Sequence, residues 1–329
     1  MLRTALVTVV TRNYLHYARV LAESCERWQP DMPLTVVLAD SLPASHSLDQ
    51  HLARVLLAEQ LGIDDWNRFT FKYTPFELCC ALKPHAMQAL FAQGFERVVF
   101  IDSDLALYGP LASIEQALQT HSIALVPHLH RPLPRDGRKP LENNFLNAGT
   151  FNGGLVACCN DPQGQQFLQW WGDHFCNDCY VDVAGGVFVD QKWLNLAPGL
   201  FPSLAIVRQP GCNAGHWTLS QFPLSGDREQ GYCVGDYPLG KRFISATSSP
   251  PIHWSLCTAS RASASEQPRT GALVRDYHGF ATKRSRAVRV AEVPIRPTLR
   301  WYTDPTRVRE AVRRNHKELR GIKDPSMCN

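Results

Sequence analysis

Two aspartates separated by one residue follow a short apolar run in the first third of the sequence. Asp102 and Asp104 come directly after residues 97–101, Arg-Val-Val-Phe-Ile, which are typical of a buried strand. Ligands of open parallel sheets bind outside the carboxyl ends of the strands. Two neighbouring carboxylates repel each other, and a divalent cation with oxygen ligands relieves that repulsion. The pair therefore predicts a metal site that leaves positions for a diphosphate. Two solvated turn aspartates are the alternative interpretation.

Two later polar groups are suited to binding hydroxyl groups of a ligand. Asn152, Gly153 and Gly154 open an apolar run, and an amide beside two glycines can bind hydroxyls while the backbone approaches closely. A bulge or turn in the sheet is the alternative. Asp190 can accept hydrogen bonds from hydroxyls, whereas Gln191 is not a base at neutral pH. Asp190 could equally be a helix N-cap.

The hydrophobic periodicity indicates the elements that must hold these residues. Strand, helix and strand within the first forty residues form a βαβ unit, which predicts an α/β fold with a mixed, mostly parallel sheet flanked by helices. Residues 127–147, rich in Pro, Arg and Asn, are expected to be a long loop. The predicted strands are residues 4–10, 34–38, 97–101, 123–126 and 151–159. The predicted helices are residues 14–28, 51–62, 77–93 and 162–175.

Composition narrows the class of protein. The chain has 329 residues, of which 44% are hydrophobic and 19% charged, and this excludes a disordered protein. Apolar runs stay short of the roughly 18–20 residues that a membrane-spanning helix needs. We see no secretory signal, so a cytoplasmic protein is expected. The eleven cysteines are predicted to be free, mostly buried thiols, because the one Cys-x-x-Cys lacks a second pair.

The last fifty residues differ in charge from the rest. Residues 281–329 carry 13 Lys or Arg and 5 Asp or Glu, whereas residues 1–280 carry 21 and 25. A basic tail on a mildly acidic body points to a polyanionic surface. Residues 304–320 are predicted to form a basic helix. The interpretations are a solvated terminal helix or an interfacial anchor on anionic lipid at the inner membrane face. No nucleic acid is expected, because no binding motif accompanies the charge.

Several segments together resemble GT-A glycosyltransferases, which transfer a sugar from a nucleotide diphosphate. Residues 100–105, Phe-Ile-Asp-Ser-Asp-Leu, resemble the metal site of that fold. Residues 151–156 and 189–195 are similar to strand-entry and Asp-Gln-x-x-Leu-Asn segments of the family that contains glycogenin and bacterial lipopolysaccharide galactosyltransferases. Lys83-Pro84 and Cys212-Asn213 resemble that family's basic residue near the donor and its Asn-rich turn. The resemblance spans residues 4–257 and implies a GT-A catalytic domain, followed by a linker at 258–281 and a basic extension at 282–329.

The resemblance implies a role for each candidate residue. Asp102, Asp104 and His253 would bind Mn²⁺ or Mg²⁺, and Asp190 and Gln191 would be catalytic. A loop or core histidine is the alternative for His253, and helix packing is the alternative for Tyr14. The residues implied in binding the nucleotide-sugar are Thr8, Thr11, Tyr14, Asp40, Lys83, Ser103, Asn152, Gly153 and Gly154. Asp40 could instead position the first loop.

The sequence departs from the resembled family after His253. Leu256 occupies the glycine position and no Lys-Pro-Trp follows, so the diphosphate cation is expected from Lys83, Arg12 or Arg261. We therefore expect a divergent relative of that family. His216 and Trp217 are candidates for the acceptor side, with core packing as the alternative for Trp217.

These residues imply a metal-dependent transfer of a sugar from a UDP-sugar to a glycan or lipid-linked acceptor, as in cell-surface polysaccharide synthesis. The resembled family retains anomeric configuration, with Gln191 near the sugar, whereas Asp190 acting as a base would give inversion. One alternative is a non-catalytic nucleotide-sugar-binding or scaffold protein. A sugar nucleotidyltransferase is disfavoured, because residues 10–14 lack the glycines of a phosphate loop.

Overall fold

The structure is a computed structural model, and it describes residues 2–40, 52, 54–137, 139–227, 231–238 and 244–245. Four sequence predictions concern residues outside these ranges: the metal ligand His253, the cation Arg261, the linker at 258–281 and the basic extension at 282–329.

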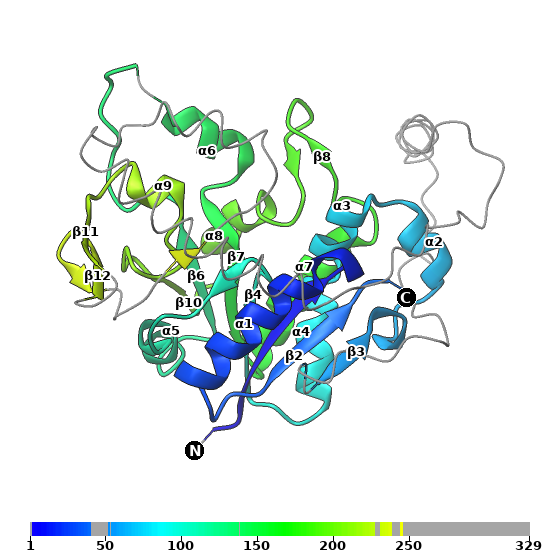
Figure 1. The fold of residues 1–329 in the computed structure, drawn as a ribbon. Coiled ribbons are helices and arrows are strands. Elements are labelled where there is room, and N and C mark those ends of the chain that lie inside the picture. The colour runs from blue at the N-terminus through cyan, green and yellow to red at the C-terminus, as the bar shows by residue number, and fades with distance from the viewer. Residues whose placement is uncertain are drawn as a thin grey trace.

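Seven strands form the central sheet in the order β10-β6-β7-β4-β1-β2-β3 (Figure 1). Strand β7 runs antiparallel to both of its neighbours, and the other six strands share one direction. The predicted mixed, mostly parallel sheet flanked by helices is therefore confirmed. The strands are β1 (Thr4–Val10), β2 (Leu34–Leu38), β3 (Val55–Leu57), β4 (Arg97–Ile101), β6 (Ile123–Pro127), β7 (Phe151–Cys159) and β10 (Leu204–Ile206).

The reversed direction of β7 decides where the site forms. Because β7 is antiparallel to β4, the start of β7 lies beside the end of β4, with Leu155 opposite Ile101. The main-chain N–H of Asp102 donates to the carbonyl of Gly154 at 2.8 Å, which continues this pairing by one residue. The two polar segments that follow β4 and open β7 are thus neighbours at one edge of the sheet.

Helices cover both faces of the sheet, and alternation along β1 shows the two layers. Ala5 and Val7 pack with side chains of α4 (Lys83–Ala92) and α7 (Pro162–Phe175). Leu6 faces the other way, toward α1 (Leu15–Trp28) and α5 (Ala112–Ala117). This period of two is expected of a strand buried on both faces.

The remaining elements form the connections and the small sheets. The helical ones are η1 (Arg12–Tyr14), η2 (Ala58–Gln60), α2 (Trp66–Phe71), α3 (Pro75–Ala81), α6 (Glu142–Ala148), η3 (Trp193–Asn195), α8 (Ala197–Leu200) and α9 (His216–Leu219). The strands are β5 (Leu105–Ala106), β8 (Val181–Asp182), β9 (Val187–Phe188), β11 (Leu224–Asp227), β12 (Gly231–Val234), β13 (Tyr237–Pro238) and β14 (Ile244–Ser245). In Figure 1, α6 and β8 lie at the top of the molecule.

Three predicted elements are wrong in type or extent. Residues 51–62 were expected to be helical, but β3 pairs with the edge of β2 and only η2 follows it. The helix predicted at 77–93 is two helices divided at Leu82, because Pro84 fits only in the first turn of α4. The long loop predicted at 127–147 ends in α6, where Leu141 N–H donates to Asn144 Oδ1 at 2.8 Å and starts the helix.

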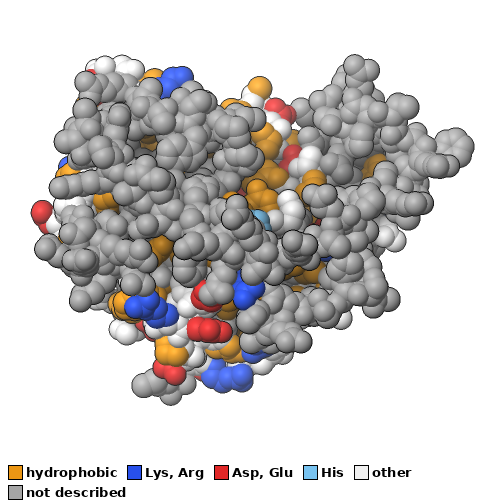
Figure 2. Space-filling view, viewed as in Figure 1, with side chains coloured by type: hydrophobic (Ala, Val, Ile, Leu, Met, Phe, Trp, Pro, Cys, Tyr) orange, Lys and Arg blue, Asp and Glu red, His pale blue; other side chains and the backbone are white. Residues whose placement is uncertain are grey.

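Surface charge and thiols agree with the composition. Along the lower edge of the face in Figure 2, basic side chains lie among acidic ones, so the described part of this face has mixed charge.

All nine described cysteines are free thiols, as predicted. Among the described residues, every helix is too short or too polar to cross a membrane.

Candidate active site

Lys83 is the centre of the polar cluster at the carboxyl edge of β4. As the first residue of α4 it is buried, and its Nζ lies 2.9 Å from Asp190 Oδ2, 2.9 Å from the carbonyl oxygen of Gly153 and 3.2 Å from Asp102 Oδ1. The ammonium also stands 4.7 Å above the ring of Phe100. An ammonium has three N–H donors, so these three oxygens satisfy it. Lys83 therefore joins Asp102 to Asp190 and does not extend free toward a diphosphate.

The charge of Lys83 is held in place by its partners. Burial by itself lowers the pKa of the ammonium, but Asp102 and then Asp190 outweigh it and raise the pKa well above its ordinary value. Asp190 is only 2% exposed, whereas the side chain of Asp102 is 41% exposed. Asp102 is thus the carboxylate of this group that has room for a ligand.

Gly153 and Gly154 leave room for carboxylates of the protein. A Cβ on Gly153 would lie 2.1 Å from Asp190 Oδ2, and one on Gly154 would lie 2.6 Å from Asp102 Oδ2. Both distances are far inside van der Waals contact. The glycines were predicted to let the backbone approach a sugar. In the structure this space is filled by the two carboxylates that Lys83 binds.

Asp190 and Gln191 are fixed by main-chain contacts. The preceding residue, Val189, has a φ of +39°, a left-handed conformation that is costly for a β-branched side chain. The indole N–H of Trp171 donates to the carbonyl of Asp190 at 3.2 Å. Gln191 Nε2 donates to the carbonyl of Ala148 at 2.9 Å. The N-cap of the next helical turn, η3, is Lys192, so Asp190 does not cap a helix.

Asn152 and Trp217 contact protein groups. Asn152 Nδ2 lies 3.2 Å from His128 Nε2, and its Oδ1 accepts from the N–H of Gly154 at 2.6 Å. The ring of Trp217 is buried 5.1 Å from that of His128. The core-packing alternative therefore describes Trp217, while the side chain of His216 lies outside what the structure describes.

The predicted nucleoside residues divide into two groups. Asp40, at the end of β2, accepts from the N–H of Arg12 at 2.5 Å and lies 3.8 Å from its guanidinium Nε. It therefore positions the loop after β1. Thr11 Oγ1 donates to Asn13 Oδ1 at 2.5 Å within this loop. Thr8 is different, because it is completely buried on the α1 face of the sheet and has no surface for a nucleotide.

Tyr14 connects this loop to the acidic pair. Its ring centroid lies 5.4 Å from that of Tyr17, and it packs on the apolar cluster under α1. Burial, then Tyr17, then Asp104 raise the pKa of the Tyr14 hydroxyl. The negative charge of Asp104 is thus close enough to act on Tyr14, which places the loop after β1 beside the loop after β4.

Asp102 and Asp104 fit part of a divalent cation site. Burial and then the charge of Asp102 raise the pKa of Asp104 to about 7, so negative charge here is incompletely compensated. The partial burial of Asp102 also raises its pKa, against the effect of Lys83. Carboxylate oxygens are the ligands that Mg²⁺ and Mn²⁺ prefer. Within the described ranges, no group of three His, Cys, Asp or Glu side chains completes a site, and the predicted third ligand, His253, lies outside them.

The raised pKa of Asp104 predicts how metal-free stability depends on pH. A carboxyl whose pKa is raised in the folded state binds protons more tightly there than in the unfolded chain, so its stability contribution is lost as pH rises from about 4 through 7. In EDTA, Asp104→Asn is expected to be more stable than wild type at pH 8 by roughly 2 to 4 kcal/mol and to match it near pH 4. Urea unfolding across this range measures the effect. The exposed Asp64→Asn is the control, and equal slopes for wild type and Asp104→Asn would contradict the assignment.

Sequence reasoning missed two residues that support this site. Phe100 lies under the ammonium of Lys83, and Trp171 holds the carbonyl of Asp190. Both stand in apolar segments that predict only core packing. The one available signal was that a buried Trp needs a partner for its indole N–H.

Comparisons with known proteins add distant likenesses. No family model matches the sequence. The chain is similar to "Uncharacterized protein YfnF" of Bacillus subtilis (strain 168), with 26% identity over 228 residues that cover 68% of this chain and 74% of that protein. Among solved structures, mouse xyloside xylosyltransferase 1 is 15% identical, with 62% of this chain and 84% of that one covered and a TM-score of 0.37. A putative nucleotide-diphospho-sugar transferase from Desulfovibrio desulfuricans G20 is 13% identical, with 84% and 99% covered and a TM-score of 0.35.

Proposed function

We propose that this protein is a metal-dependent glycosyltransferase that uses a nucleotide-diphospho-sugar, with a UDP-sugar as the expected donor. One observation carries the proposal. Asp102, Gly153 and Asp190 come from three separate segments, and Lys83 binds all three at the carboxyl edge of a mostly parallel sheet. That edge is where open α/β sheets bind nucleotides and phosphorylated ligands.

The loops after β1 and β2 are assigned to the nucleoside. Thr11 and Tyr14 flank η1, and Asp40 holds this loop through the main chain of Arg12. The half-buried ring of Tyr14 can stack on a base, and the charge of Asp104 reaches it. Arg12, which remains partly exposed, is the candidate cation for the diphosphate, because the ammonium of Lys83 is already occupied.

Asp102 and Asp104 would hold the divalent cation, with His253 as the expected third ligand. When bound, such a cation supplies positive charge that stabilises a leaving diphosphate. Ser103 lies between the two aspartates in the turn after β4 and is assigned to the nucleotide-sugar side of this site.

Transfer requires one bond to break and one to form at the anomeric carbon. The bond from this carbon to the diphosphate oxygen breaks, the acceptor hydroxyl forms the new bond, and its proton passes to the leaving diphosphate. The ammonium of Lys83 binds the carboxylate of Asp190, and the carbonyl of Ala148 accepts from the amide of Gln191, so both side chains are fixed in place. The buried carboxylate of Asp190 is already bound to Lys83, and the Gln191 amide is neutral, so neither side chain is placed to take the proton, and this favours retention. We assign a glycan or a lipid-linked glycan as the acceptor. Residues 282–329 are assigned to contact with an anionic membrane surface, from the positive charge of these residues alone.

Calorimetric titration of UDP with and without Mn²⁺ tests this function. We expect binding that requires Mn²⁺ in wild type and a loss of roughly 100-fold or more in Asp104→Ala, because a divalent site with one carboxylate fewer binds the cation weakly. Asp64→Ala, which removes an exposed carboxylate elsewhere, is the matched control. Metal-independent UDP binding, or unchanged binding in Asp104→Ala, would overturn the proposal. Mn²⁺-dependent binding without hydrolysis of any UDP-sugar would instead support the non-catalytic alternative.

A further inference from the structure

Strand β7 pairs irregularly with β6 where it passes the candidate active site. Leu125 lies opposite Val156, but Pro127 lies opposite Phe151, so one residue of β6 faces four residues of β7. Regular antiparallel strands pair one residue with one, so β7 has three extra residues here. We call residues 152–154 the β7 bulge. Bulges redirect the backbone and are frequent beside active sites.

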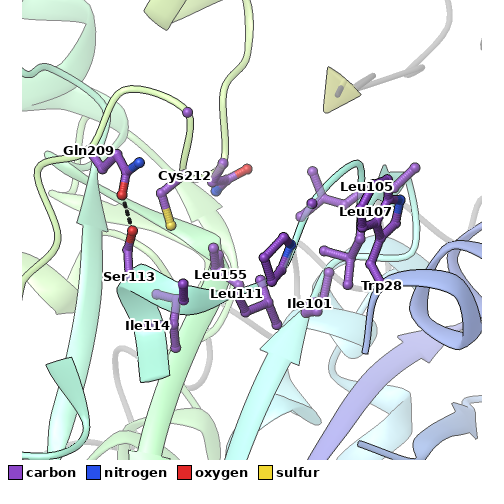
Figure 3. Close-up of a pocket in the computed structure, with 16 residues that line it drawn as sticks. Trp28, Ile101, Leu105, Leu107, Leu111, Ser113, Ile114, Leu155, Gln209 and Cys212 are labelled. Carbon is purple, nitrogen blue, oxygen red and sulfur yellow. Dashed lines mark hydrogen bonds between the residues drawn. The ribbon is translucent and has the colours of Figure 1, made fainter. Parts of the chain in front are cut away.

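Buried apolar side chains fix both ends of the β7 bulge. Phe151 precedes it and Leu155 follows it, and both are buried. Figure 3 shows Leu155 in the wall of an apolar cavity beside α5, which Ile101 and Leu111 also line. Between these two ends lie two glycines and one polar side chain. The shape of the bulge itself therefore depends on hydrogen bonds and not on packing.

The β7 bulge turns two carbonyl groups toward the candidate active site. The carbonyl of Gly153 accepts from Lys83 Nζ at 2.9 Å, and that of Gly154 accepts from the N–H of Asp102 at 2.8 Å. The side chain of Asn152 closes the bulge, because its Oδ1 accepts from the N–H of Gly154 at 2.6 Å. The orientation of the Asn152 amide thus decides whether the bulge keeps this shape.

His128, directly after β6, contacts the other end of this amide. Its ring is buried, with centroids 5.5 Å from Phe145 and 5.1 Å from Trp217, and its Nε2 lies 3.2 Å from Asn152 Nδ2. Because Asn152 Oδ1 is bound to a main-chain N–H, the amide directs an N–H donor at the ring. An N–H donor needs an unprotonated nitrogen as its acceptor. The hydrogen bonds therefore place the ring proton of His128 on Nδ1.

We propose that neutral His128 is a positioning residue for the donor site. Its Nε2 holds the amide of Asn152, and Asn152 holds the β7 bulge in the shape from which two carbonyls reach Lys83 and Asp102. The name donor site rests on the proposed function, whereas the hold of His128 on the bulge does not.

Nitrogen NMR of the full-length chain, with ¹⁵N-labelled histidine, tests the position of the ring proton. The resonances of His128 are those lost in His128→Gln. At pH 8 we expect an unprotonated Nε2 and a protonated Nδ1. Asn152→Asp places a carboxylate oxygen against Nε2 and should bring a proton onto it, because a carboxylate only accepts. Asn160→Asp, beyond the opposite end of β7, is the matched control and should leave the His128 resonances unchanged. A protonated Nε2 in wild type would overturn the proposal.

Amide hydrogen exchange tests the hold on the bulge. His128→Leu removes the acceptor, whereas His128→Gln keeps an oxygen near the place of Nε2. We expect peptides that contain the Gly154 N–H to exchange about fivefold faster in His128→Leu, the value of one hydrogen bond, and as in wild type in His128→Gln. His121→Leu, before the start of β6, is the control and should also match wild type. Equal exchange in His128→Leu and His128→Gln would contradict the proposal. The proton position decides it if His128→Leu does not fold.

Titration with UDP and Mn²⁺ separates this inference from the proposed function. If wild type binds UDP with Mn²⁺, His128→Leu should bind it roughly fivefold more weakly than His128→Gln. Equal affinities of the two variants would remove His128 from the donor site. If wild type does not bind UDP, the proposed function fails, and the proton position and amide exchange still decide whether His128 holds the bulge.

Discussion

Lys83→Met is expected to lower the free energy of unfolding by about 3–5 kcal/mol, the usual cost of removing one partner from a buried ion pair. Methionine fills a similar volume, so the loss is mainly electrostatic. Without the ammonium, the carboxylate of Asp190, which is only 2% exposed, has no cation beside it. The carboxylate of Asp102, which bound the same ammonium, then adds repulsion. Urea unfolding at pH 8 in EDTA measures the change.

A second lysine and a second substitution distinguish this cause from simple loss of packing. Lys72 Nζ bonds to the carbonyl of Cys176 at 2.5 Å and to Asn177 Oδ1 at 3.1 Å. Lys72→Met should cost less, about 1 kcal/mol, because Lys72 is only half-buried and both of these acceptors are neutral. Adding Asp190→Asn to Lys83→Met should recover part of the lost stability, because a buried charge is removed. If Lys83→Met costs no more than Lys72→Met, Lys83 does not hold the two carboxylates.

The positions of Asp40, Asp102 and Asn152 were predictable, because each follows or opens a segment with a clear pattern. Residues 4–10, 97–101 and 151–159 are strands with the predicted bounds, and the direction of the sheet places Asp102 at its carboxyl edge. The apolar pattern was misleading at residues 51–62. The edge strand there has only three residues, which is too short to show the alternation of a strand. Short apolar runs do not distinguish a strand from a helix by period alone.

The contacts within the site could not be predicted, because they depend on how distant segments pack. Lys83 lies 70 residues from Gly153 and 107 from Asp190 in the sequence. A lysine before a DxD pattern resembles a phosphate ligand, and only the contacts of Lys83 with Gly153 and Asp190 show that its donors are occupied. The neighbours of Gly153 and Gly154 could not be predicted for the same reason. Their small size was recognised, and the structure adds that Asp190 and Asp102 lie where the two Cβ atoms would be.

Gly153→Ala is expected to disrupt both stability and transfer. The new Cβ would lie 2.1 Å from Asp190 Oδ2 and 3.2 Å from the Cβ of Gln191. The carboxylate cannot turn away without leaving Lys83, which also binds the carbonyl of Gly153 itself. Overpacking of this kind costs about 1–3 kcal/mol. Displacement of Asp190 by about 1 Å should lower the rate of sugar transfer roughly 100-fold.

Gly172→Ala is the matched control for this substitution. Gly172 lies inside α7, and a Cβ there would meet its nearest neighbour, His85 Cε1, at 3.7 Å, which is ordinary contact. Alanine is the better helix former by about 1 kcal/mol, so Gly172→Ala should keep or raise the midpoint of urea unfolding and leave transfer unchanged. If Gly153→Ala behaves like Gly172→Ala, Asp190 moves without cost. Its fixed place between Lys83 and Gly153 then cannot be what catalysis depends on.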